Sequence, residues 1–133
     1  MNTFTLIIEY EISHLNYLFI QHIKSLRDKK GWLQKELSEK MGVTSGFIGN
    51  IENLNERHKY SVGHIALLSK AFNYKSPSKL FHFTSPEYDE VKLKVKVTKE
   101  NYTTTTKDGV EIKKSRVISS ELLDIIPTKD FII

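Results

Sequence analysis

Residues 31–53, GWLQKELSEKMGVTSGFIGNIEN, predict two short helices joined by a tight turn. The first helix is expected over residues 34–41, and Gly42 follows at the point where a left-handed residue ends a helix. Thr44 is then expected to cap a second helix that runs to about residue 53. Two helices that cross through such a turn leave the start of the second one exposed. Their apolar positions at helical spacing are Leu37, Met41, Phe47, Ile48 and Ile51.

The same spacing continues on both sides of this stretch. A helix is predicted over residues 15–30, capped by Ser13 and closed by Gly31. After a polar and basic loop, LNERHKY at residues 54–60, a fourth helix is predicted from Ser61. A short fifth helix is expected from Ser76 and Pro77, burying Leu80 and Phe81. Five helices with short connections predict a compact bundle.

Beyond Pro86 the pattern changes from helical to strand-like spacing. Apolar residues alternate with Lys92, Lys94 and Lys96, residues 101–109 are rich in threonine and turn formers, and residues 110–118 favour strand again. This pattern predicts a β-hairpin. An isolated hairpin is marginally stable in water, so its apolar side needs a third strand or another body.

The N-terminal segment offers that third strand. Residues 3–12 alternate apolar and polar side chains, which favours a half-buried strand; an additional helical turn leading into Ser13 is the alternative. Either this segment lies beside the hairpin in a small antiparallel sheet, or two copies of the chain pair their hairpins. The apolar end, residues 121–133, is not expected to float free.

Composition and charge limit the function. Residues 15–83 carry 11 Lys and Arg against 5 Asp and Glu, whereas residues 84–133 carry 9 of each, so the positive charge belongs to the helical part. That is where a polyphosphate partner would need it. The absence of cysteine excludes disulfides and metal–thiolate sites and fits a reducing cytoplasm. No signal peptide is expected, and no apolar run approaches the roughly 20 residues that cross a bilayer.

Residues 18–83 resemble the Cro and phage-repressor type of helix-turn-helix domain, the XRE family. The resemblance rests on IKSLRDKKGWLQKELSEKMGVTSGFIGNIEN and the later HIALLSKAF. It implies a mainly α, lambda-repressor-like DNA-binding domain of five helices, to which a small antiparallel β-hairpin or sheet is added. The chain would then divide into an N-terminal strand or extension (1–14), the DNA-binding domain (15–83) and a β-hairpin extension for dimerisation or partner contact (88–133).

The resemblance also implies which residues face DNA. The counterpart of Gln34 contacts a phosphate, and the counterparts of Thr44, Ser45, Gly46, Phe47 and Asn50 face the groove or its walls. Phe47 is equally suited to the core. Lys35, one residue into the same helix, and Asn55, Arg57 and Lys59 in the basic loop are further predicted contacts, with Arg57 and Lys59 expected on phosphates.

Three positions depart from the family pattern. Leu33 replaces the usual Ser or Thr cap, which weakens the helix start by roughly 1 kcal/mol unless another group satisfies its amides. Ser38 replaces the usual alanine. Gly46 and Gly49 are expected inside the reading helix, each at a cost of about 1 kcal/mol relative to alanine. Because that helix holds no Arg or Lys, direct base readout is expected to be limited.

No catalytic, metal or cofactor site is expected. The five histidines are spread over several elements, and Asp28, Glu36, Glu39 and Glu52 are expected on helix surfaces, away from any nucleophile. The sequence therefore predicts a cytoplasmic, sequence-specific DNA-binding transcriptional regulator, a repressor that acts as a homodimer on an operator in double-stranded DNA. The alternative is a protein-interaction module, an antitoxin or phage-type accessory factor, which holds another protein through residues 88–133.

Overall fold

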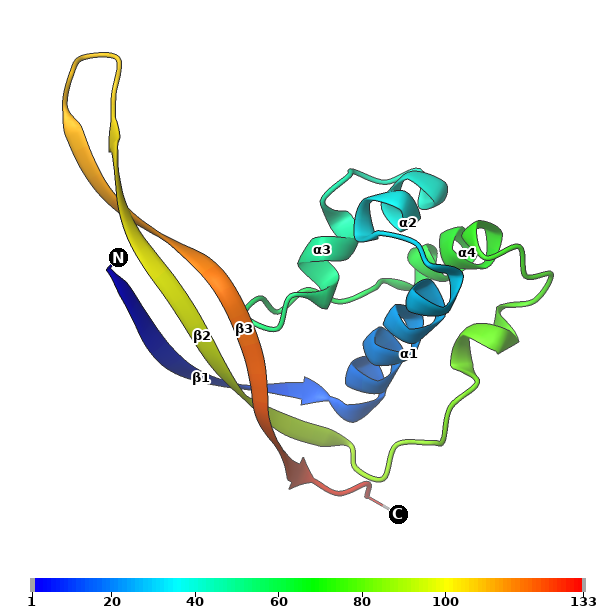
Figure 1. Cartoon of the computed structure of the whole chain (residues 1–133). Helices are drawn as coiled ribbons and strands as arrows, with labels where there is room; N and C mark the ends of the chain where they lie inside the picture. Colours follow the sequence, from blue (N-terminus) through cyan, green and yellow to red (C-terminus); the bar gives the residue numbers. More distant parts are fainter. Residues whose placement is uncertain (1, 133) are drawn as a thin grey trace.

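The computed structural model describes residues 2–132, and it places a helical body beside a long twisted sheet (Figure 1). The three strands pair in the order β1-β2-β3. Helix and strand contents are roughly equal, so the expectation of a mainly α protein is wrong. The elements in chain order are β1 (Thr3–Ser13), α1 (His14–Lys30), α2 (Gln34–Met41), α3 (Phe47–Glu52), α4 (Val62–Ala71), the 3-10 helix η1 (Pro77–Phe81), β2 (Glu90–Thr105) and β3 (Glu111–Lys129).

The helix ends follow the predicted caps at three places. The Ser13 hydroxyl accepts a hydrogen bond from the Asn16 amide, 3.3 Å away, at the start of α1. Gly31 and Gly42 end α1 and α2 in the left-handed region, at φ of 71° and 75°. Both positions need a residue without a Cβ, since other residues are strained there.

The predicted fifth helix is instead η1, a five-residue 3-10 segment. Ser76 caps it and Pro77 lies in its first turn, as the sequence indicates. Runs of 3-10 helix stay short because their hydrogen-bond geometry is poor. Leu80 is fully buried, but Phe81 keeps 39% of its surface exposed, so only one of the two expected anchors enters the core.

The N-terminal alternating segment is a strand, and it pairs with the hairpin. The β1–β2 register runs without a shift from Thr3 opposite Glu100 to Ser13 opposite Glu90. The N-terminal strand and the C-terminal strand thus belong to one sheet, at its two opposite edges, on one side of the helical body (Figure 1). β2 continues as far as Thr105, so the turn expected over residues 101–109 shrinks to the few residues around Gly109, which has φ of 78°.

β3 pairs with β2 less regularly than β1 does. Its register shifts opposite Glu90/Val91, Lys94/Val95 and Thr98/Lys99, which leaves three extra residues on β3: Thr128, Leu123 and Ile118. Each is a β-bulge, a feature that increases local twist and interrupts the outer hydrogen-bonding edge of a strand. The C-terminal stretch is therefore a strand as far as Lys129, whereas Phe131 and Ile132 lie beyond the strand and are exposed.

Two apolar cores lie side by side. The helical core is centred on Ile23, Leu37, Ile48 and Leu68, all with no exposed surface. The sheet core consists of Tyr10 and the predicted inward positions of β2, which are Val91, Leu93, Val95 and Val97. Ile12 packs against both cores. The cores are therefore joined at the point where β1 leads into α1.

Candidate nucleic-acid interface

The start of α3 is open to solvent. Thr44, Ser45, Gly46 and Asn50 are all exposed. The hydroxyls of Thr44 and Ser45 and the carboxamide of Asn50 supply hydrogen-bond donors and acceptors of the kind that contact phosphates and base edges.

The helix begins later than the sequence indicates. The Thr44 carbonyl accepts from the Phe47 amide at 3.0 Å, which closes a turn, and the first α-type bond joins the Asn50 amide to the Gly46 carbonyl. Thr44 is therefore not the cap. Gly46 is the capping residue by position and has no side chain to offer, so one helix-weakening glycine lies outside the helix.

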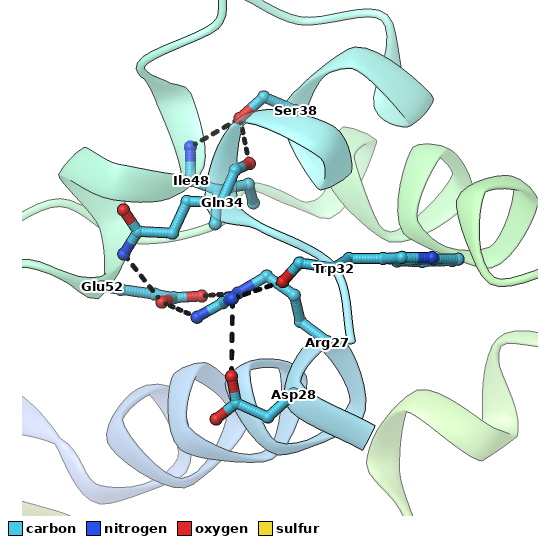
Figure 2. Close-up of polar contacts among 7 residues, drawn as sticks. All are labelled: Arg27, Asp28, Trp32, Gln34, Ser38, Ile48 and Glu52. Atoms are coloured by element: carbon cyan, nitrogen blue, oxygen red, sulfur yellow. Dashed lines mark hydrogen bonds and ion pairs between the residues drawn. The ribbon is translucent and has the colours of Figure 1, made fainter. Parts of the chain in front are cut away.

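Ser38 of α2 performs the capping role from across the turn (Figure 2). Its hydroxyl accepts from the buried Ile48 amide at 3.1 Å and donates to the Gln34 carbonyl at 3.1 Å. An amide in the first turn of a helix has no partner within the helix, and leaving it unbonded when buried costs about 1–3 kcal/mol. The serine that departs from the family pattern thus fixes α3 against α2.

A buried ion pair holds α1, α3 and the intervening chain together (Figure 2). The Arg27 guanidinium donates two hydrogen bonds to the Glu52 carboxylate, at 2.7 and 2.9 Å, and a third to the Trp32 carbonyl at 2.7 Å. Because the Glu52 side chain is only 2% exposed, its expected surface position is wrong. Hydrogen bonding to Glu52 raises the pKa of Arg27 further above its ordinary value. Arg27 therefore adds no free positive charge for a polyphosphate.

Gln34 is held by the same carboxylate. Its side-chain amide donates to Glu52 at 3.0 Å (Figure 2). A Cβ at Gly49 would lie 3.2 Å from the Gln34 side-chain oxygen, so glycine at that position gives Gln34 room to cross α3. Lys35, beside it, is exposed and 4.0 Å from Glu39, a surface pair of little energetic weight. The lack of a side-chain cap at Leu33 is compensated in part, since the Leu33 amide donates a hydrogen bond to the Glu36 carboxylate at 3.2 Å.

Phe47 is partly buried rather than freely exposed. Its ring centroid lies 4.5 Å from that of His64 and 6.1 Å from that of Tyr60. Of the two roles that the sequence allows, this packing favours the core, and contact of its remaining surface with DNA stays a prediction.

The Tyr60 hydroxyl is buried and has no hydrogen-bond partner among residues 2–132. Burial, followed by the negative charge of Glu52, raises the pKa of Tyr60 above its ordinary value of 10.0, and Arg27 opposes the shift. The folded state therefore keeps a proton that the unfolded chain loses above pH 10. The contribution of protonated Tyr60 to the free energy of unfolding is complete below pH 10 and declines as the pH rises above 10.

We expect Tyr60→Phe to remove this decline. Between wild type and variant, the slope of unfolding free energy against pH above 10 should differ by up to about 1.4 kcal/mol per pH unit. Urea denaturation at a series of alkaline pH values measures it. Tyr102→Phe, on the hairpin, serves as the control because Tyr102 belongs to neither apolar core, and this variant should keep the slope of the wild type. Equal slopes for wild type and Tyr60→Phe would contradict the assignment.

The basic loop after α3 docks on the sheet. The Leu54 carbonyl accepts from the Tyr10 hydroxyl at 2.9 Å, and the side chains of Asn55 and Ser120 are 3.4 Å apart. The Arg57 guanidinium lies 5.2 Å from the Tyr10 ring centroid, a cation–π contact. Arg57 and Lys59 are exposed and border a cavity of about 310 Å³ between this loop, α1 and β1. The ten predicted contacts therefore form two groups, one on the α2–α3 face and one beside the sheet.

The strand lysines face acidic neighbours on the outer surface of the sheet. Lys94 lies between Glu9 and Asp124 in the strand register, and the Lys92 ammonium is 3.2 Å from the Glu9 carboxylate. This arrangement favours a solvated charged face over an extended DNA footprint. Within residues 2–132, no group of three or more His, Asp or Glu side chains is placed to hold a metal ion.

Sequence reasoning missed the residues that position the interface. Ser38 of α2 accepts a hydrogen bond from Ile48 of α3, and Arg27 of α1 donates to Glu52 of α3. The one sequence signal for these roles is the serine at position 38, where the family pattern has alanine. No described helix has both the length and the apolar character needed to pass through a bilayer.

Residues 23–80 match the family described as Helix-turn-helix. One similar solved structure is titled "Crystal Structure of hypothetical transcription factor NHTF from Neisseria"; it is 21% identical, with a TM-score of 0.43 over 50% of this chain and 72% of that chain. No curated protein sequence matches this chain. Through its residues 23–80, the chain carries a DNA-binding helix-turn-helix domain of the Cro and phage-repressor (XRE) type.

Proposed function

We propose that the protein is a sequence-specific transcriptional regulator that represses by occupying an operator as a homodimer. The observation that supports it is the exposed start of α3, with Ser45 and Asn50 outward, on a scaffold fixed by buried polar contacts. Rigid presentation matters because a side chain that reads a base edge must be held in register. Under this proposal, repression follows from occupancy of the operator and needs no chemical step.

Selection from a pool of randomised duplexes tests this proposal. A homodimer should enrich one sequence as two inverted half-sites about one helical turn, roughly 34–36 Å, apart. Affinity for the enriched duplex should fall steeply with salt, because phosphate contacts release counterions. A pool that remains random after repeated rounds would contradict sequence-specific binding.

Single substitutions separate base contacts from phosphate contacts. Asn50→Ala should cost about 1–3 kcal/mol on the enriched duplex and little on random DNA. Lys59→Ala should weaken binding to the enriched duplex and to random DNA alike, and should lower the slope of log affinity against log salt concentration by about one unit. Lys59 gives a cleaner test than Arg57, whose guanidinium already contacts Tyr10. Lys75→Ala, an exposed cation after α4, is the matched control and should leave the slope unchanged. An unchanged slope for Lys59→Ala would remove the loop from the interface.

A protein-interaction module is the second candidate. It is favoured by the lack of any Lys or Arg between Val43 and Glu56, a segment that includes all of α3. Under this alternative, duplex binding is weak at low salt and shows no preferred sequence. The selection experiment therefore discriminates the two.

A further inference from the structure

The two edges of the sheet differ in their protection. β3 carries three bulges and contains Pro127, which has no amide hydrogen to donate. Bulges and proline are devices that prevent an edge strand from pairing with another chain. β1 has neither device, and its 11 residues keep a regular register with β2. β1 is thus an edge left open to pairing.

The outer side of β1 is unoccupied within residues 2–132. From Thr3 to Ile12, the backbone of β1 is hydrogen-bonded to β2 alone. Two of its aliphatic side chains, Leu6 and Ile7, remain 42% and 52% exposed. The strand also contains no lysine or arginine, the charges that most often protect an edge.

We propose that β1 pairs antiparallel with β1 of a second copy of this chain, about a two-fold axis at Ile7. Two three-stranded sheets then form one six-stranded sheet. The inference rests on the homodimer of the proposed function and names its surface. It replaces the hairpin, which the sequence had suggested as the pairing element.

The register follows from charge and side-chain direction. A two-fold axis perpendicular to the sheet keeps each inward side chain on its own face, since directly opposed residues point the same way. Centring at Ile7 places Glu9 and Glu11 opposite threonines of the second copy and Leu6 opposite Ile8. Centring at Ile8 would place Glu9 opposite the apolar Ile7, and centring at Glu9 would oppose two carboxylates, which is destabilising.

This pairing also places the two helical bodies on one face of the sheet, at a spacing suited to DNA. Because the axis is perpendicular to the sheet, both bodies lie on the same face. Ser13, where β1 leads into α1, is six residues from Ile7. At about 3.4 Å per residue, the two Ser13 positions lie roughly 40 Å apart, the same order as one turn of DNA.

Cysteine cross-linking tests the proposal, because the chain contains no cysteine of its own. Opposed residues of antiparallel strands have Cα atoms about 4.5–5.5 Å apart, within the range that a disulfide spans. Ile7→Cys should therefore oxidise to a covalent dimer. A mixture of Thr5→Cys and Glu9→Cys should form the heterodimer in preference to either homodimer, which fixes the register. Leu123→Cys, 44% exposed on the β3 edge, is the matched control and should remain uncross-linked.

The dimer constant provides an independent measurement. Ile7→Lys opposes two ammonium groups at the axis and should raise the dissociation constant at least about tenfold, whereas Leu123→Lys should not change it. Trp32 fluorescence reports whether each variant remains folded, since that ring packs on Phe72 in the helical body. If the wild type is a dimer in solution, but Leu123→Cys cross-links and Ile7→Cys does not, the β1 interface is wrong although the dimer stands. A wild-type monomer at the highest attainable concentration overturns both, and duplex binding then tests DNA recognition separately.

Discussion

Replacement of Glu52 by leucine should lower the free energy of unfolding by about 3–5 kcal/mol, because it leaves the Arg27 charge buried without its partner. The Arg27 side chain is only 9% exposed and directs two of its hydrogen bonds to this carboxylate. Gln34 would lose its acceptor as well. Urea denaturation followed by Trp32 fluorescence measures the change.

A second substitution separates charge burial from packing. Arg27→Met combined with Glu52→Leu replaces the buried pair by apolar side chains, and such replacements are often neutral or stabilising. We therefore expect the double variant to recover most of the stability lost by Glu52→Leu. If the double variant loses as much free energy of unfolding as the single variants Arg27→Met and Glu52→Leu lose together, the pair contributes through shape rather than through charge.

Leu93→Ala should destabilise the protein by about 2–5 kcal/mol, because it leaves a cavity in the sheet core. Leu93 is 1% exposed and opposes Tyr10 in the β1–β2 register. Leu123→Ala, on a bulge of β3, is the matched control, and an exposed leucine of this kind should change stability by about 0.5 kcal/mol or less. Thermal or urea unfolding followed by circular dichroism measures both.

The same variant tests whether helices and sheet unfold together. Trp32 is the single tryptophan and reports on the helical body, whereas circular dichroism also reports on the sheet. Because Ile12 packs on both cores and the Tyr10 hydroxyl bonds to Leu54, we expect the two signals to shift equally. A shift confined to circular dichroism would show two independent units and would support the division at residue 83.

Local sequence signals predicted the elements whose cause is local. Ser13, Gly31 and Gly42 mark helix ends because their side chains, or the lack of one, act within a few residues. The alternation around Leu93 predicted the buried face of β2 because side chains in a strand alternate strictly. These signals gave the helical body and the hairpin.

Features that depend on distant residues could not be read in this way. Glu52 has the composition of a surface carboxylate, and only the approach of Arg27, 25 residues away, makes it a buried one. The start of α3 shifted because Ser38 supplies an acceptor from another helix. The bulges of β3 likewise result from pairing with β2, and they decide which edge of the sheet is open.

The pairing of the first strand with a late one has a consequence for synthesis. Thr3 finds its partner at Glu100, so β1 leaves the ribosome before the whole helical body has been translated. At typical elongation rates the wait lasts roughly 5–20 s. The helices must therefore fold while this apolar strand is still single, and closure of the sheet becomes a late, long-range step of the kind that slows folding.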